Sequence, residues 1–565
     1  MSNVNAPRVR RSVRDLQKLY DNGEKKPLED LVRAWAGIQA LPPSDPKSFF
    51  ALGGYHGEPF QYRKPVDALP QSDIYPYWGG YCNHGNVLFP TWHRMYVYKL
   101  EEALQSIVPG VSMPFWDETD EYTLRHGIPS ILTQETFELD GTPIDNPLRS
   151  FVLPDALSDR LPGDGSIYEK PKGYLTVRYP LSGLVGTPEA LEQTKLHNAK
   201  FPLPEKNTEL LNGNVRAWLR GDSPTPDDPD PTRNGVYAKY VRCLSAPNYT
   251  VFSNTTSASV WSSSNPGLVT AVESPHNDIH LAVGGFDYGG RETGQIAGAN
   301  GDMGAHNDIH LAVGGFDYGG RETGQIAGAN GDMGENNTAG MDPIFFFHHC
   351  NVDRMFWVWQ KQTGHTDRLD IIRNYPGTNA SDSQGPTPGF APGESLNLKT
   401  PLNPFKKASG EAYTSEDCIN IERQLGFTYG PGSLDDVTPE LKSLLAVPSG
   451  NSTKKLTVTG IDRALIQGSF IMKAYASVTD ANGKTREYYL GHKSILSRWN
   501  VVHCANCLTH LDVVAHFPLS AMPADDVPKA EFRVKIIHRG GGVPSASKAA
   551  IGVVSGLQPN FEVSD

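Results

Sequence analysis

The chain contains little cysteine, no long apolar run and no excess of positive charge. Its six cysteines among 565 residues are too sparse for the disulfide framework of a small secreted domain. No stretch approaches the roughly 20 apolar residues of a membrane-spanning helix, so we expect no membrane partner. The formal net charge of −12 argues against nucleic acid and against an anionic membrane surface as partners.

The first residues also lack a recognisable targeting segment. Residues 1–16 are polar and basic, without the apolar core of a secretory signal. We therefore expect a cytoplasmic or cell-wall-associated protein. Its hydrophobic fraction of 38% and charged fraction of 20% are those of a globular protein. Because 565 residues exceed what one hydrophobic core supports, at least two domains are predicted.

A buried helix with unusual polar residues is predicted from residue 342 onward. Asp342 is a good N-cap, and Pro343 is a good first helical residue. The residues that follow are apolar on nearly every face, which is typical of a buried helix. Such a helix should not carry His348, His349 and Asp353 unless these side chains are paired or bound. Asp353 lies one turn after His349, where it can orient a ligand ring, and a metal site is the natural explanation.

A second group of histidines lies near residue 90. Thr91 can cap a helix over residues 92–105, which places His93 in the first turn and His84 on the loop before it. His56 follows a Gly-Gly-Tyr sequence farther upstream. For two histidines alone, an ordinary structural role is the simpler interpretation. Three imidazoles without a cysteine pair or a carboxylate favour copper.

Two motifs in the chain resemble the copper signatures of the tyrosinase family. The first signature is matched in order by His84, Phe89, Pro90, Trp92, His93, Arg94, Val97 and Glu101. The second is matched by Asp342, Pro343, Phe345, His349 and Asp353. The resemblance covers roughly residues 8–430 and is greatest to the latent tyrosinases of filamentous fungi.

The resemblance implies a set of ligands for two copper ions. The copper A ligands would be His56, His84 and His93. The third copper B ligand would be His349, with His348 and Asp353 standing behind the ligands as packing or orienting groups. The family often carries a cysteine joined by a thioether to the second copper A ligand, which here implies a bond between Cys82 and His84. A free buried cysteine is the alternative.

The first two copper B ligands are ambiguous because residues 276–304 recur unchanged as residues 306–334. The two candidate pairs are His276 with His280, and His306 with His310. In each pair the histidines are four residues apart and share one helix face. Two copies with unlike flanks do not make a solenoid. The identical copy indicates a recent duplication or an artefact of the gene model.

We favour the first pair as the copper B ligands. In the family, a glutamate three residues before the first ligand and an asparagine just after it hold a water near the metals. Glu273 and Asn277 match these positions, whereas the second copy has Met303 in place of the glutamate. Against this choice, the second copy lies nearer in sequence to His349. Extra residues are tolerated better in a loop than ahead of a ligand helix, which supports the first copy.

By resemblance, the protein is a type-3 dicopper oxidase with O2 as co-substrate. It would hydroxylate small monophenols to ortho-diphenols and oxidise these to ortho-quinones, the chemistry of melanin. A catechol or ortho-aminophenol oxidase without monophenol hydroxylation stays open, as does a haemocyanin-like O2 carrier. A hydrolytic zinc or iron centre is less well supported because no carboxylate occurs among the expected ligands. The resemblance also leaves a homo-oligomer open.

The expected architecture is mainly α, with a β domain at the end. We predict a four-helix-bundle dicopper core over residues 1–432, a processed linker over 433–455 and a C-terminal β-sandwich over 456–565. Period-2 patterns predict strands at 456–460, 469–479, 485–490 and 530–537. The dipeptide at 482–483 is Asn-Gly, a strong hairpin turn. In latent members of the family such a domain covers the copper site until proteolysis.

A Cys-X-X-Cys sequence lies within the predicted β domain. Without a second such pair, Cys504 and Cys507 are unsuited to structural zinc. In some fungal tyrosinases a similar pair assists copper loading, and we adopt that role as the leading hypothesis. His492, His516 and His538 are expected to be ordinary strand or surface histidines.

Overall fold

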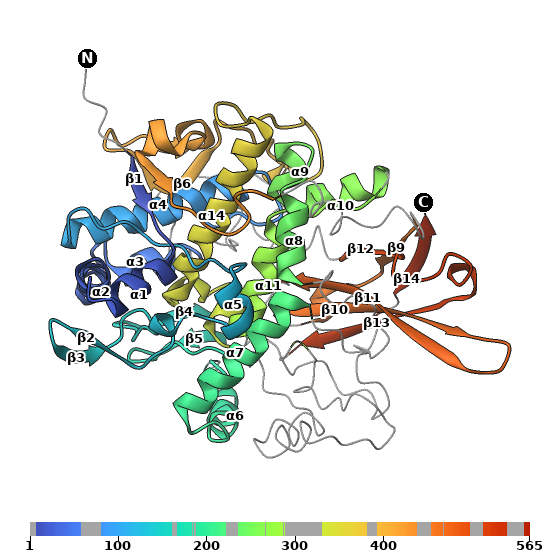
Figure 1. The fold of residues 1–565 in the computed structure, drawn as a ribbon, viewed down its shortest axis with the longest axis horizontal. Helices are drawn as coiled ribbons and strands as arrows, with labels where there is room; N and C mark the ends of the chain where they lie inside the picture. Colours follow the sequence, from blue (N-terminus) through green and yellow to red (C-terminus); the bar gives the residue numbers. More distant parts are fainter. Residues whose placement is uncertain are drawn as a thin grey trace.

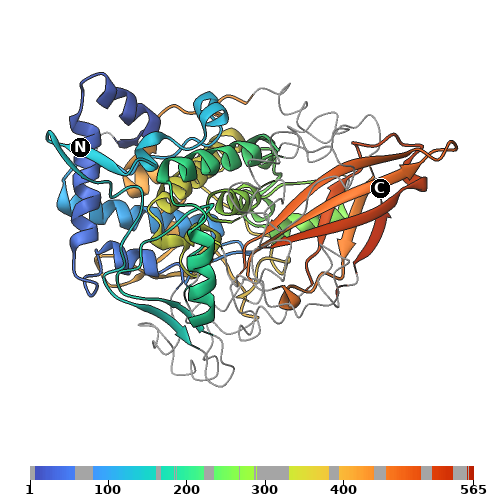
Figure 2. The same ribbon diagram turned by 90° about the horizontal axis from the view of Figure 1, so that it is seen from below.

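The computed structural model describes most of the chain. The described residues are 7–57, 81–160, 167–183, 185, 188–221, 235–265, 267–285, 288, 330–380, 393–437, 454–466, 468–497, 512–538, 557 and 559–564. They form a helical core from which two β-sheets project at one end (Figures 1 and 2). Among the described helices, none combines the length and the apolar character that a membrane crossing requires.

Three helices occupy the centre of the helical core. Helix α4 (Phe89–Ile107) packs against α14 (Ile344–Thr363), and α11 (Glu273–Gly284) also packs against α14. The surrounding helices are α1 (Val13–Asp21), α2 (Lys26–Ala40), α3 (Phe49–Gly54), α5 (Glu121–His126), α6 (Pro188–Asn198), α7 (Pro204–Arg220), α8 (Val236–Cys243), α9 (Tyr249–Ser253) and α10 (Thr255–Ser264). Short hairpins join them: β2 (Thr136–Leu139) with β3 (Thr142–Asp145), β4 (Leu157–Arg160) with β5 (Ile167–Lys170), and β6 (Pro401–Lys406) with β7 (Ala412–Thr414).

Helix α14 begins close to the predicted position. Its first residue is Ile344, with Pro343 at the N-cap. The Asp342 carboxylate accepts a hydrogen bond from the Ile344 amide at 3.1 Å, so it satisfies a free N–H group of the first turn from just outside the helix. The helix ends at Gly364, whose φ of 76° costs glycine little.

The predicted start of α4 is wrong by about one turn. The helix begins at Phe89, with Leu88 at the N-cap and Pro90 in the first turn. Thr91 therefore lies inside the helix, and its hydroxyl donates to the Leu88 carbonyl at 3.2 Å. The preference of threonine for the N-cap was outweighed by that of proline for the first turn, where the missing N–H costs nothing.

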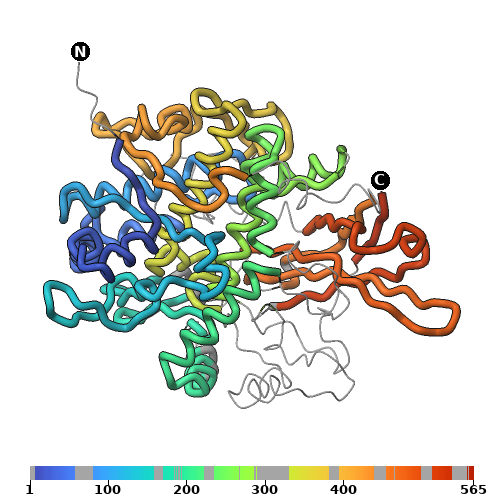
Figure 3. Tube along the Cα trace, viewed as in Figure 1, coloured from blue at the N-terminus to red at the C-terminus, as the bar shows by residue number. Residues whose placement is uncertain are grey.

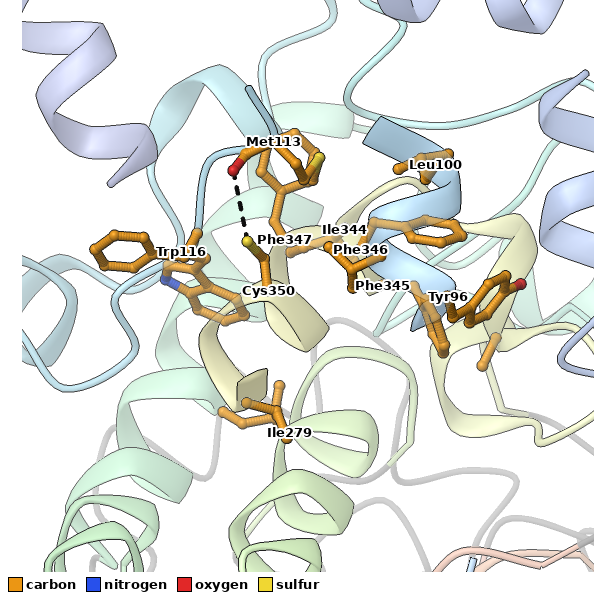
Figure 4. Packing of buried hydrophobic residues seen from close by; sticks show 14 of the residues in the cluster. Tyr96, Leu100, Met113, Trp116, Ile279, Ile344, Phe345, Phe346, Phe347 and Cys350 are labelled. Atoms are coloured by element: carbon orange, nitrogen blue, oxygen red, sulfur yellow. Dashed lines mark hydrogen bonds between the residues drawn. The ribbon is translucent and has the colours of Figure 1, made fainter. Parts of the chain in front are cut away.

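Aromatic residues of α14 fill the space beside α4 and α11 (Figure 4). The Phe345 and Phe346 rings lie 5.6 and 4.9 Å from the Tyr96 ring of α4, measured between centroids. Ile279 of α11 reaches toward α14 from another side. All four side chains are fully buried, and such close packing leaves the central helices little freedom to shift.

The described C-terminal part consists of two three-stranded antiparallel sheets. The first contains β10 (Phe470–Thr479) between β11 (Thr485–Ile495) and β13 (Glu531–His538). The second contains β9 (Lys455–Thr459) between β12 (Ala515–Pro518) and β14 (Asn560–Ser564). Residues from both sheets share a buried hydrophobic cluster that is distinct from the cluster of the helical core.

The strand predictions for this part are confirmed, with two omissions. Strands β9, β10, β11 and β13 coincide with the four predicted segments, although β11 continues beyond its predicted end. A turn joins β10 to β11 where the hairpin was predicted: the Gly483 amide donates to the Asp480 carbonyl at 2.9 Å, and Gly483 itself follows with a φ of 79°. The short strands β12 and β14 were not predicted.

The two ends of the helical part lie side by side (Figure 3). Strand β1 (Arg8–Arg10) pairs in parallel with β8 (Phe427–Tyr429), with Val9 opposite Thr428. The guanidinium of Arg10 lies 3.6 Å above the centre of the Phe427 ring, a favourable cation–π arrangement. This pairing closes the helical part just before the linker expected from residue 433.

Candidate metal centre

The first cluster of histidines comes from three separate places in the chain. His56 follows α3, His84 lies on the loop before α4, and His93 lies in the second turn of α4. One nitrogen of each ring lies within 4.8 Å of the others, and all three side chains are buried. The Nε2 atom of His93 is buried and has no hydrogen-bond partner among the described residues. The structure thus brings together the three residues expected at copper A.

The second cluster combines two helices. His276 and His280 of α11 lie one turn apart, and their Nε2 atoms are 3.1 Å from each other. The Nε2 atom of His349 in α14 lies 3.2 and 3.4 Å from these two atoms, respectively. The neighbouring His348 completes a buried group of four that could hold a metal ion.

The two clusters adjoin one another. The His93 ring stacks on the His349 ring with centroids 4.4 Å apart and an interplanar angle of 17°. The His84 and His276 rings lie 5.5 Å apart, and the His56 and His280 rings lie 6.3 Å apart. Every ring of the first cluster therefore has a neighbour in the second, which places both metal positions within reach of one small bridging molecule.

Backbone carbonyls orient several of these rings through Nδ1. The Nδ1 atom of His93 bonds the Phe89 carbonyl at 2.8 Å. The other two carbonyls, those of Met333 and Asn336, belong to one segment that spans residues 330–342. The Asn336 carbonyl lies 2.8 Å from His56 Nδ1, and the Met333 carbonyl lies 2.8 Å from His280 Nδ1. Such partners fix the ring and its tautomer, and they leave Nε2 as the ligand atom.

The electrostatics of the site also suit a metal. Burial, followed by the neighbouring histidines, lowers the pKa well below the ordinary value for His93, His276, His280 and His349. The rings are accordingly neutral at neutral pH and can offer lone pairs to a cation. The donor set of both clusters is imidazole without carboxylate, a set that suits copper better than magnesium, calcium or manganese.

His348 is linked to a buried carboxylate on the side away from the ligands. Its Nδ1 lies 2.5 Å from Glu118 Oε1, and Glu118 Oε2 accepts a hydrogen bond from the Tyr240 hydroxyl at 2.7 Å. Burial raises the pKa of Glu118 well above its usual range and lowers the pKa of His348 to about 3. Glu118 and Tyr240 were not predicted, because no local pattern links residues so far apart in sequence.

The expectation that Asp353 orients the His349 ring is wrong. The Asp353 carboxylate instead accepts hydrogen bonds from Arg94 Nε and from the Tyr429 hydroxyl, both at 2.5 Å. His349 Nδ1 is buried without a hydrogen-bond partner among the described residues. The carboxylate pairs with Arg94 rather than with the imidazole because a buried guanidinium charge needs an opposite charge beside it. Asp353 therefore fastens α14 to α4.

Glu273 and Asn277 lie one turn apart on α11, beside the second cluster. Glu273 Oε1 accepts from the Gly85 amide at 2.8 Å, and Oε2 accepts from the amide and hydroxyl of Thr255 at 2.7 and 2.9 Å. Burial raises the pKa of Glu273. The Asn277 Oδ1 atom lies 2.9 Å from His276 Nδ1. Glu273 thus ties the loop that carries the first cluster to the helix that carries the second.

For some of the predicted site residues, the structure does not test the predicted role. The Cys82 thiol lies 3.9 Å from His84 Nδ1, so the two residues are neighbours, and the thioether stays a prediction. The alternative pair His306 and His310, the Cys504–Cys507 pair and most of the linker lie outside the described residues.

The fold and the paired clusters define a helical protein with two adjoining, buried histidine clusters that could hold metal ions. The family model described as the common central domain of tyrosinase matches residues 46–304 and 287–362. A tyrosinase from Hahella sp. (strain CCB-MM4) is 62% identical over 540 residues, covering 94% of this chain and 92% of the relative. The tyrosinase of Aspergillus oryzae is 40% identical, covering 92% and 90%. The solved tyrosinase from Burkholderia thailandensis at low pH is 89% identical, with a TM-score of 0.85, covering 99% of this chain and 100% of that one.

The chain belongs to the tyrosinase family. It is accordingly an oxidoreductase of a family of copper enzymes, and its histidine clusters could hold the metal. The two family matches overlap within the repeated segment, in keeping with the duplication found in the sequence.

Proposed function

We propose that this protein is a type-3 dicopper oxidase that hydroxylates monophenols and oxidises the resulting ortho-diphenols to ortho-quinones. In the complete reaction one monophenol and one O2 give one ortho-quinone and one water. The observation that carries the proposal is the pair of adjoining, buried, all-histidine clusters. Family membership supports the same conclusion.

The proposed ligands divide evenly between the two metals. Copper A would be held by His56, His84 and His93, and copper B by His276, His280 and His349. Bound copper would supply the binding and activation of O2. The carbonyls at Nδ1 would hold the rings in place, and the neutral state of the imidazoles would keep their lone pairs available.

Two further residues of α11 are proposed to handle the substrate proton. Glu273 and Asn277 share a helix face, since they are four positions apart, and they would hold a water beside copper B. The raised pKa of Glu273 suits a group that helps to accept a proton near neutral pH. The incoming phenol would lose its proton to this water before its ortho carbon is attacked. His348, fixed by Glu118, would stand behind copper B.

The proposal keeps the finer architecture expected from the sequence. A four-helix bundle would surround the copper pair within residues 1–432, a processed linker would span 433–455, and a C-terminal β-sandwich would cover the site in a latent pro-enzyme. The hydrophobic cluster shared by the two C-terminal sheets supports a sandwich. The packing of Ile471 and Ile537 into the cluster of the helical core supports a cover.

Metal analysis combined with O2 consumption tests the proposal. The full chain, loaded with copper, should hold two copper ions and should turn over both a monophenol and its ortho-diphenol after mild proteolysis. Turnover of the ortho-diphenol alone would instead identify a catechol oxidase. Two bound coppers without any turnover after proteolysis would identify an O2 carrier and would overturn the proposal.

A further inference from the structure

The copper B helix α11 carries a charged residue that the proposed chemistry does not use. Asp278 lies between His276 and His280 and is fully buried. Residues two positions apart on a helix point about 200° apart, so the Asp278 side chain faces away from the histidine cluster. It lies where α11 meets α8 of the helical core and β11 of the C-terminal sheet.

Three donors from two parts of the chain converge on the Asp278 carboxylate. Ser494 Oγ donates to Oδ1 at 2.6 Å. Lys239 Nζ lies 2.7 Å from Oδ2, and His492 Nε2 lies 3.2 Å from the same oxygen. Lys239 belongs to α8, whereas Ser494 and His492 belong to β11. The C-terminal sheet therefore reaches the back of the copper B helix through this carboxylate.

His492 is held on its other nitrogen as well. Its Nδ1 atom lies 3.3 Å from the Tyr489 hydroxyl and 3.4 Å from the Tyr288 hydroxyl. The Trp218 ring of α7 stands edge-on to the imidazole at a centroid distance of 5.4 Å. Lys473 of β10 donates to the Tyr288 carbonyl. His492 lies in a strand, as expected, but it is not a surface histidine, because it is buried between the sheet and the core.

The charge of Asp278 makes these donors necessary. The Lys239 ammonium lies 2.7 Å from Oδ2, and the Ser494 hydroxyl and the His492 ring lie at hydrogen-bond distance, which is the setting of an ionised carboxylate. A buried carboxylate is tolerated only when its oxygens are well supplied with donors. Without β11, the carboxylate would keep Lys239 alone of the three donors, and α11 would lose its attachment on this side.

The ligand rings have separate partners on the metal side. The Met333 carbonyl fixes the plane of the His280 ring, and the Asn277 side chain meets His276. These contacts orient the rings but leave the rotation of α11 about its own axis to the packing behind it. Asp278 is the charged side chain that opposes this rotation where α11 meets α8 and β11, while Asn214 of α7 donates to the Ala282 carbonyl at 2.9 Å farther along the helix.

We propose that Asp278 is a positioning residue for copper B, and that the C-terminal sheet acts on the metal site through it. By fixing the rotation of α11, the carboxylate keeps both helix histidines directed at the third ligand. The inference rests on the proposed function, since it takes the second histidine cluster as a copper site. Copper A, whose ligands lie on α4 and two loops, is not held by this contact.

Selective loss of one copper is the expected result of removing the charge. Asp278→Asn keeps the size of the side chain but weakens its bond to Lys239. Loss of a group that orients metal ligands typically weakens metal binding by about 10- to 100-fold. The full-length variant, loaded with copper and dialysed against a graded chelator, should retain copper A like the parent and release the second copper at least about tenfold more readily. A merely structural role would lower the retention of both coppers together.

A second variant and a matched control complete the experiment. Ser494→Ala removes one hydroxyl donor from β11 without touching the ligand helix, and it should weaken the second copper in the same direction. His516→Ala removes a different contact between the sheets and the core, to Ser259 and Ser263 of α10, and should leave both coppers in place. Parent-like retention of both coppers in Asp278→Asn and Ser494→Ala would overturn the inference. A parent that holds no copper would instead overturn the proposed function.

Discussion

Two carboxylates on α11 have opposite surroundings. Burial raises the pKa of Glu273, which meets only neutral donors, namely two backbone amides and a hydroxyl. The pKa of Asp278 is lowered to about 2 because Lys239 and His492 outweigh burial. Environments that separate the pKa values of two neighbouring acids assign them different roles. Of the two, Glu273 with its raised pKa is the better suited to the proton exchange proposed for it, whereas Asp278 is suited to a permanent charge.

Glu273→Gln is expected to impair monophenol hydroxylation more than diphenol oxidation. The amide cannot help the proposed water to accept the phenol proton, and a general base contributes typically about 10²- to 10⁴-fold. We expect kcat/KM for a monophenol to fall about 100-fold and kcat/KM for the matching ortho-diphenol to fall less than about tenfold. Initial rates on both substrates, at equal copper content, measure the difference. Equal losses would contradict the assignment.

The duplicated histidine pairs should differ in their effect on copper binding. His276 and His280 approach His349 to within 3.4 Å, whereas nothing is described for His306 and His310. Alanine at both positions of the first pair should remove about half of the bound copper and all activity, because two of three ligands are lost. Alanine at both positions of the second pair should change neither. Metal analysis of the two double variants decides, and the reverse result would assign copper B to the second copy.

The sequence specified the metal site better than the groups behind it. His93 and His349 were identifiable because they lie in long motifs with fixed spacing. Asp353 was assigned to His349 from helical spacing alone, but Arg94, more than 250 residues earlier in the chain, took its carboxylate. The partners of Asp278 could not be predicted for the same reason. Spacing along one helix does not indicate which side chains of another element will contact it.

At the scale of elements, strong local patterns were sufficient and weak ones were not. Helix α14 was predicted from apolar content and proline, and helix α4 from a threonine cap. Their starts erred by one to three residues because several residues can serve as caps. Strand β10 was predicted because its ten residues are rich in alternating apolar side chains. Strand β12 spans only four residues and ends in Pro518, and a proline argues against a strand in a sequence pattern.

The junction between β11 and α11 should respond to pH through His492. Burial, together with Lys239, lowers the pKa of His492 to about 4, against about 6.5 for an unfolded histidine. Between pH 6.5 and pH 4 the folded state therefore binds fewer protons at His492 than the unfolded state does. As the pH falls through this range, the folded state loses stability relative to the unfolded state. At pH 5 the loss amounts to about 2 kcal/mol.

His492→Gln should remove that part of the acid sensitivity. We expect the thermal midpoint of the parent to fall more between pH 7.5 and pH 5 than that of the variant, by the equivalent of about 2 kcal/mol. Unfolding followed by circular dichroism at both pH values provides the measurement. His126, exposed in α5, offers the matched control as His126→Gln, which should keep the pH response of the parent. An identical pH response in the parent and His492→Gln would contradict the prediction.

At the scale of the whole molecule, the described fold takes the two ends of the repeated unit from different copies. The helix with His276 and His280 comes from the first copy, and the turn at Asn330–Gly334 comes from the end of the second. Gly331 and Gly284 approach each other, with the Gly331 amide donating to the Gly284 carbonyl. The two copies are identical and offset by 30 residues. The beginning of the first copy and the end of the second therefore have the same sequences as the beginning and the end of a single copy.

Deletion of residues 289–318 is therefore expected to leave the protein intact. The deletion joins Tyr288 to residues 319–334, which are identical with residues 289–304, and it retains every described residue on both sides. We expect unchanged copper content, unchanged activity and a thermal midpoint no lower than that of the parent. Loss of copper on deletion would show that the removed residues take part in the metal site.

The segment of residues 330–342 has a consequence for how the two metals can be adjusted. Its carbonyls at Asn336 and Met333 direct one ring in each cluster. A substitution that displaces this short stretch would alter the electrostatic field at both of the metal positions that we propose, so the reduction potentials of the two metals could not be set independently there. Substitutions in this stretch would shift the reduction potentials of both metals together. A shift confined to one metal must come from another contact, such as the Phe89 carbonyl that bonds His93 Nδ1.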